Sequence, residues 1–246
     1  MLLTRLTNGV SIATCARAGA ATAGIAVCVT GGVRAQTTGE GGYAHLVEHL
    51  VFEAHTRWSG FDAVGKPINA YTGREQIALT GFVPGQDAAR LIELFAQMTL
   101  DVQFSEAAIA AERERIEIED AQSLESTTDC VEQGVVDTIW PGHPIAQPLV
   151  GDARNLAGAT ASSLQRFWRR VLRGSGTFVF GVGAVDHREI EAAAQALSAL
   201  PRDSALDWQT APRFAGGARR EYARVSDARV LWVFPMPAPN QKQHDA

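Results

Sequence analysis

The stretch His45-Leu46-Val47-Glu48-His49 constrains the fold most, because it places three polar side chains within an otherwise apolar segment. His45 and His49 are four residues apart, so on a helix with about 3.6 residues per turn their imidazoles project from the same side. Two neutral imidazoles at this spacing can bind one Zn²⁺ through nitrogens that lie about 2.0–2.1 Å from the metal. Glu48 lies beside the second histidine, where its carboxylate can reach a metal-bound water.

Histidine pairs at this spacing also have a simpler interpretation, since they occur on ordinary helices as solvated or hydrogen-bonded side chains. The apolar neighbours favour a metal site, because polar groups within an apolar helix need partners and a metal provides them. These neighbours are Leu46, Val47, Leu50, Val51 and Phe52. The pattern still lacks a third ligand.

A candidate for the third ligand lies in residues 110–120, which contain strong helix formers and neither glycine nor proline. Steps of three, four and seven residues return to one helix face, and that face carries Ile109, Glu112, Ile116 and Glu119. Glu119 can complete a His, His, Glu set, and Glu112 can orient a ligand histidine through a hydrogen bond. The alternative is a solvated charged helix, and periodicity alone does not choose between the two.

Several motifs, taken in order, resemble the N-terminal half of the pitrilysin (insulinase, M16) family of zinc peptidases. A glycine-led helix containing the two histidines comes first, an Asn-Ala-Tyr-Thr strand follows, and a Glu-Arg pair precedes a later glutamate. The matching stretches are Gly41–Phe52, Asn69–Glu75, Glu112-Arg113 with Glu119, His143-Pro144 with Gly151, and Phe178–Asp186. The resemblance covers nearly the whole chain.

This resemblance implies an α+β fold, in which a mixed, mostly antiparallel sheet packs against helices. Such a chain is one M16-type half with the LuxS/MPP-like metallohydrolase fold. The resemblance also implies one Zn²⁺ per chain, bound by His45, His49 and Glu119. Glu48 is then the catalytic base, and Glu112 orients a ligand histidine.

The resemblance further implies a peptide substrate. The residues Asn69, Ala70, Tyr71 and Thr72 resemble the family's edge strand, which pairs with the main chain of a bound peptide. The alternative for these residues is a plain buried strand. We therefore expect a zinc-dependent metalloendopeptidase that hydrolyses short or unfolded peptides, with a role such as leader-peptide processing.

Family members usually carry two homologous halves, in one chain or in two subunits, and the second half supplies an arginine and a tyrosine for substrate binding. We therefore expect a second M16-type half as partner, in a homodimer or a heterodimer, unless the chain is a fragment. The alternative function is a non-catalytic M16-like scaffold subunit that needs such a partner. Glu48 argues against it, because a scaffold has no need for a base between two ligands. A metal-carrier domain is a third possibility, although an open zinc position suits catalysis better.

Composition excludes other classes of function. The net charge is −5 and no basic stripe is present, so we expect no nucleic-acid partner. No apolar stretch is long enough to span a membrane, and we expect no membrane association. Cys15, Cys28 and Cys130 are odd in number and scattered, which is typical of buried free thiols in a reducing compartment. We therefore expect a cytoplasmic protein.

The pattern of apolar and turn residues predicts the order of elements. The predicted strands cover a hairpin in 3–14, the ranges 25–30, 68–72, 76–82 and 177–182, and one or two further strands in 219–234. The predicted helices cover the stretch around His45 and His49 and the ranges 88–99, 106–120, 130–139, 161–172 and 187–200. Ser105 is a candidate N-cap of the acidic helix. We expect a peptidase domain over residues 1–212, further strands or the start of a second half over 213–236, and a disordered tail over 237–246.

Overall fold

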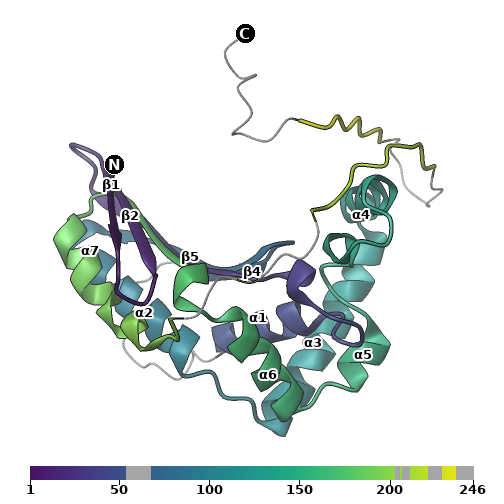
Figure 1. Ribbon diagram of the computed structural model, residues 1–246, viewed down its shortest axis with the longest axis horizontal. Coiled ribbons are helices and arrows are strands. Elements are labelled where there is room, and N and C mark those ends of the chain that lie inside the picture. Colours follow the sequence, from purple (N-terminus) through teal and green to yellow (C-terminus); the bar gives the residue numbers. More distant parts are fainter. Residues whose placement is uncertain (54–67, 203–205, 207–210, 221–228, 237–246) are drawn as a thin grey trace.

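The computed structural model describes residues 1–53, 68–202, 206, 211–220 and 229–236. Its centre is a six-stranded sheet with the strand order β1-β2-β6-β3-β5-β4 (Figure 1). The strands are β1 (Leu2–Arg5), β2 (Ser11–Ala16), β3 (Thr22–Thr30), β4 (Ile68–Thr72), β5 (Gln76–Pro84) and β6 (Thr177–Gly183). Strands β2 and β6 run parallel, and every other neighbouring pair in this sheet is antiparallel.

Helices cover one face of this sheet, and further helices pack mainly against these rather than against the strands (Figure 1). They are α1 (Tyr43–Glu53), α2 (Ala88–Leu100), α3 (Glu106–Glu125), α4 (Thr127–Ile139), α5 (Ala153–Ala157), α6 (Ala161–Val171) and α7 (His187–Ala193). Successive residues of β3 point to opposite faces of the sheet, and they alternate between buried and half-buried positions. One face of the strand is therefore more buried than the other. Its buried side chains join Phe95 of α2 and Phe167 of α6 in one hydrophobic core. The expected α+β fold is therefore confirmed.

Most of the predicted elements are confirmed, with ends that shift by a few residues. Ser105 caps α3 as predicted, since its hydroxyl accepts a hydrogen bond from the backbone N–H of Ala108 at 3.2 Å. None of the described helices is long and apolar enough to cross a membrane.

Two element predictions are wrong in the described residues. The helix expected over 187–200 ends at Ala193 and continues as a 3₁₀ helix, Ala194–Ala199. The tighter helix places residues three apart on one side, which buries Ala194 and Leu197 together. The strands expected within 219–234 are absent from the described residues 211–220 and 229–236. Residues 230–234 are apolar and exposed, with no described strand beside them to complete a ladder.

The cysteines also differ from expectation. Cys15, Cys28 and Cys130 are free thiols, but each is half-buried rather than fully buried. Residues 221–228 and the expected tail over 237–246 lie outside the described residues, so the division of the chain at 212 stays a prediction.

The core beneath α1 yields a stability prediction. Phe167 is fully buried and meets the ring of Tyr43 edge to face, with 6.3 Å between the ring centroids. We expect Phe167→Ala to lower the free energy of unfolding by about 3–5 kcal/mol, because it removes apolar contacts and leaves a cavity. Phe82→Ala is the matched control, since Phe82 is 66% exposed on the uncovered face of the sheet. If urea unfolding showed that the two variants lose the same free energy of unfolding, this assignment of Phe167 to the core would be contradicted.

Candidate metal centre

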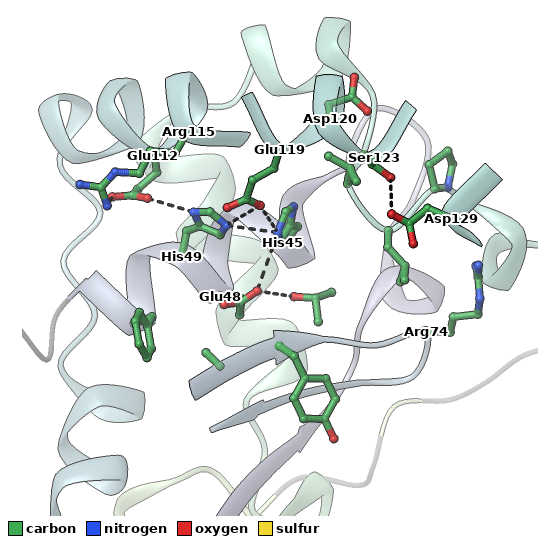
Figure 2. Close-up of a pocket in the computed structure, with 18 of the residues that line it drawn as sticks. His45, Glu48, His49, Arg74, Glu112, Arg115, Glu119, Asp120, Ser123 and Asp129 are labelled. Atoms are coloured by element: carbon green, nitrogen blue, oxygen red, sulfur yellow. Dashed lines mark hydrogen bonds and ion pairs between the residues drawn. The ribbon is translucent and has the colours of Figure 1, made fainter. Parts of the chain in front are cut away.

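Helices α1 and α3 lie side by side and bring four of the predicted site residues together (Figure 2). His45 and His49 project from successive turns of α1, and Glu112 and Glu119 project towards them from α3. The predicted inward face of α3 is confirmed, because its apolar members Ile109 and Ile116 are fully buried.

The three predicted metal ligands converge on one point. His45 Nε2 lies 3.1 Å from His49 Nε2, and Glu119 Oε2 lies 3.4 Å from each of these nitrogens. In a tetrahedral zinc site with bonds of about 2.0–2.1 Å, the ligand atoms are about 3.3–3.4 Å apart. The three atoms therefore already form a triangle of the size that zinc requires.

A buried carboxylate sets the orientation of His49. Glu112 is 2% exposed, and its Oε2 lies 3.0 Å from His49 Nδ1. Its other oxygen accepts a hydrogen bond from Arg115 at 2.7 Å. Because Glu112 is an acceptor, the proton of His49 belongs on Nδ1, which leaves the Nε2 lone pair directed at His45 and Glu119. The predicted position of Glu112 beside a ligand histidine is thus what the structure shows.

His45 lies at the same point with 14% of its side chain exposed, and its surroundings favour the neutral imidazole. Burial, followed by the neighbouring His49, lowers the pKa of His45 from its usual 6.5 to about 4, against smaller opposing effects of Glu119 and the Val150 backbone. Its Nδ1 is buried without a hydrogen-bond partner among the described residues, and its Nε2 faces His49 and Glu119. The three atoms that face one another within 3.4 Å are two imidazole nitrogens and a carboxylate oxygen, each of a type that binds zinc. The donor set fits zinc.

Glu48 lies between this triangle and the sheet. It is 8% exposed, and its Oε2 lies 3.9 Å from His45 Nε2 and accepts a hydrogen bond from the hydroxyl of Thr72 at 3.3 Å. Burial raises the pKa of Glu48 from its usual 4.5 to about 7, against smaller opposing effects of His49 and the hydrogen bond from Thr72, and with further increases from Glu119 and Glu112. A carboxyl group with this pKa can both accept and return a proton near neutral pH.

These groups open into a cavity of about 960 Å³, lined by residues of α1, β4, α3, α4 and the segment 148–151. Strand β4 forms one wall, and among the described strands it is an edge of the sheet that pairs with β5 alone. Its residues Asn69 and Tyr71 are exposed, whereas Ala70 and Thr72 are half-buried. The strand is therefore an exposed edge, and the alternative of a plain buried strand is wrong.

Three groups at the site were not predicted in the roles that the structure gives them. Thr72 was expected to contact peptide, but its hydroxyl reaches Glu48. Arg115 donates a hydrogen bond to Glu112. This contact could have been predicted from the sequence, because residues three apart on a helix are neighbours. The backbone of Val150 raises the pKa of His45, and a contribution from backbone atoms leaves no pattern in the sequence.

Comparisons with known proteins identify the family. Residues 11–153 match the model of the family described as insulinase (peptidase family M16), which covers more than half of the chain. The chain therefore belongs to this family.

Two relatives show how far the likeness extends. A mitochondrial-processing peptidase subunit beta from Blastocladiella emersonii is 28% identical over 236 residues, which cover 92% of this chain and 50% of the relative. An uncharacterised zinc protease from Rickettsia bellii is 25% identical over 222 residues, which cover 87% of this chain and 54% of the relative. The chain thus spans about half the length of both relatives.

Solved structures confirm the fold. The periplasmic protease PqqL from Escherichia coli matches with a TM-score of 0.73 at 21% identity, over 84% of this chain and 24% of that one. An inactive peptidase M16 domain from Pseudomonas fluorescens matches with a TM-score of 0.72 at 17% identity, over 83% of this chain and 52% of that one. Because a protease and an inactive domain share the fold equally well, the fold does not decide whether a chain is catalytic.

The burial of Glu48 predicts a pH dependence of stability in the metal-free chain. Below pH 4.5 this carboxyl is neutral whether the chain is folded or unfolded. Between pH 4.5 and 7 the unfolded chain ionises first, so stability falls as the pH rises. We expect Glu48→Gln to be more stable than the wild type, with an advantage that grows by roughly 2 kcal/mol between pH 5 and pH 8.

Urea unfolding in the presence of a chelator measures this difference. The lowered pKa of His45 gives stability the opposite slope between pH 4 and 6.5, but both proteins share it and it cancels in the comparison. If Glu48→Gln exceeded the wild type by the same free energy of unfolding at pH 5 and pH 8, the assignment of Glu48 as a buried carboxyl group with a raised pKa would be contradicted.

Proposed function

We propose that this chain is the zinc-binding half of a metalloendopeptidase that hydrolyses short or unfolded peptides, with a role such as leader-peptide processing. The observation that carries the proposal is the convergence of His45, His49 and Glu119 on one point, with a buried carboxyl group beside it. Membership of the M16 family and a relative named as a zinc protease support both the metal and the reaction.

The residues of the chain have separate tasks in this reaction. When bound, Zn²⁺ supplies a Lewis acid that lowers the pKa of water towards about 7 and polarises a carbonyl. Glu48 removes a proton from the attacking water and delivers it to the leaving amine, and the burial that raises its pKa makes its carboxylate a better proton acceptor. Thr72 holds the carboxyl group of Glu48 by a hydrogen bond.

Strand β4 gives the peptide a place to bind. Its outer edge has main-chain groups available for pairing, and residues 69–72 line the same cavity as the three ligands. A peptide that adds to this edge as a further strand lies extended along the wall of the cavity. Only an extended segment can pair in this way, which favours short or unfolded substrates over folded proteins.

The second candidate is a non-catalytic scaffold subunit, and the similarity to an inactive M16 domain is the observation that favours it. A buried carboxyl group argues for catalysis, because holding Glu48 away from water raises its pKa and serves no purpose in a scaffold. In either case we propose a second M16-type half as partner, in a homodimer or a heterodimer, since this chain spans about half of its relatives.

Substitutions separate metal binding from hydrolysis. We expect Glu48→Gln to keep zinc and to lose more than about 100-fold in turnover, because it removes the proton acceptor and leaves the ligand triangle intact. We expect His49→Ala and Glu119→Ala to lose both zinc and turnover. Glu114→Ala is the matched control on α3, since Glu114 is exposed and lies off the inward face.

The measurement is chelator-sensitive cleavage of quenched fluorescent peptides by the purified chain, with metal content determined on the same samples. Full zinc binding by Glu119→Ala would show that the third ligand is a different residue. Bound zinc without turnover in the wild type, alone and with every tested partner half, would favour the scaffold.

A further inference from the structure

The two histidines of the candidate metal centre are supported unequally. His49 is in the second turn of α1, where both helical hydrogen bonds and Glu112 hold it. His45 is in the first turn, where backbone N–H groups have no partner within the helix. Fraying of this end would therefore displace His45 before it affected His49.

The residue at the start of α1 cannot cap the helix itself. Gly42 has a φ of +96°, and a Cβ there would lie 2.9 Å from the Leu156 side chain and 3.1 Å from Gly151 Cα. A side chain at this position is excluded by both conformation and space. The oxygen that usually caps a helix from this position must come from another residue.

Gln36 provides that oxygen from six residues earlier. Its Oε1 accepts hydrogen bonds from the backbone N–H groups of Gly42 at 3.0 Å and Ala44 at 2.9 Å. The side chain is 3% exposed, so water cannot readily replace it. Gln36 thus caps the helix that carries both histidines.

Gln36 is itself fixed to the segment that approaches His45. Its Nε2 donates to Oε1 of Gln147 at 3.0 Å, and Arg74 donates to the carbonyls of Ile145 at 2.8 Å and Gln147 at 3.2 Å. This segment continues to Gly151, where a Cβ would come within 2.3 Å of Gly42 Cα. Val150, which acts on His45, lies between these two anchors.

We propose that Gln36 is a positioning residue for the metal centre. By capping α1 and tying its first turn to the segment 145–151, it keeps His45 Nε2 in the ligand triangle. This inference rests on the proposed zinc site, and it concerns how tightly and in what geometry the metal is held.

The test compares Gln36→Met with Gln36→Glu. Methionine fills similar space without a capping oxygen, and we expect zinc affinity to fall about 10-fold, as for the loss of other groups that orient metal ligands. Glutamate keeps the oxygen at a helix N-terminus, where negative charge is favourable, and Gln147 can turn its amide to donate. We expect Gln36→Glu to restore affinity to within about 3-fold of the wild type.

Asp186→Ala is the matched control for stability. Asp186 caps α7 by accepting from the backbone N–H groups of Arg188 and Glu189, so its loss also leaves two N–H groups without a partner. It lines no part of the cavity that holds the ligands. We expect this variant to lose stability to urea but to keep the zinc affinity of the wild type.

Two readouts test the proposal without relying on hydrolysis. Competition with a chromogenic chelator gives zinc affinity, and the visible absorption of bound Co²⁺ reports the geometry of the ligands. Weaker zinc binding and an altered cobalt spectrum in Gln36→Met alone would support the proposal. Unchanged affinity in Gln36→Met, or an equal loss in Asp186→Ala, would overturn it while leaving the zinc site in place. A wild type without zinc affinity would overturn this inference together with the proposed metal centre.

Discussion

Much of this structure serves to hold three candidate ligand atoms at one point. Two imidazole nitrogens and a carboxylate oxygen lie 3.1–3.4 Å from one another, and each of these polar groups gives up part of its contact with water to reach this point. Their approach must be enforced from outside the triangle. Helix α1 fixes the histidines relative to each other, α3 brings Glu119, and the core between the helices and the sheet keeps the two helices together.

Contacts with neighbouring residues offset the energetic cost of this arrangement, and they differ from one ligand to the next. Glu112 is nearly inaccessible to solvent and forms hydrogen bonds with both His49 and Arg115, so its charge is compensated on two sides. Among the described residues, Nδ1 of His45 has no such partner, so the position of His45 depends on the first turn of α1. Glu119 is 48% exposed and faces the cavity, which makes it the least constrained of the three ligands.

The sequence was sufficient for the parts that depend on periodicity. A spacing of four placed His45 and His49 on one face, and a spacing of seven placed Glu112 and Glu119 on another, because a helix repeats its faces at these intervals. Resemblance to a family then brought the two faces together, which periodicity could not do. The helix expected over 187–200 was wrong beyond Ala193 because tertiary packing, which buries Ala194 with Leu197, prevailed over local helix propensity.

The contacts that could not be predicted are those without a characteristic spacing. Gln36 caps a helix from an irregular loop, and the hydroxyl of Thr72 reaches Glu48 from another element of the fold. Neither contact follows from a repeat, since each depends on how separate segments pack.

The contrast between a protein named as a protease and an inactive domain on the same fold leaves the question of function to individual side chains. A sheet with helices on one face is stable whatever residue lies beside the two histidines. An apolar residue at position 48 would avoid the desolvation that raises the pKa of Glu48 to about 7. A carboxyl group kept there at such a cost, within reach of the ligand triangle and of a peptide-sized cavity, is better explained by proton transfer than by packing.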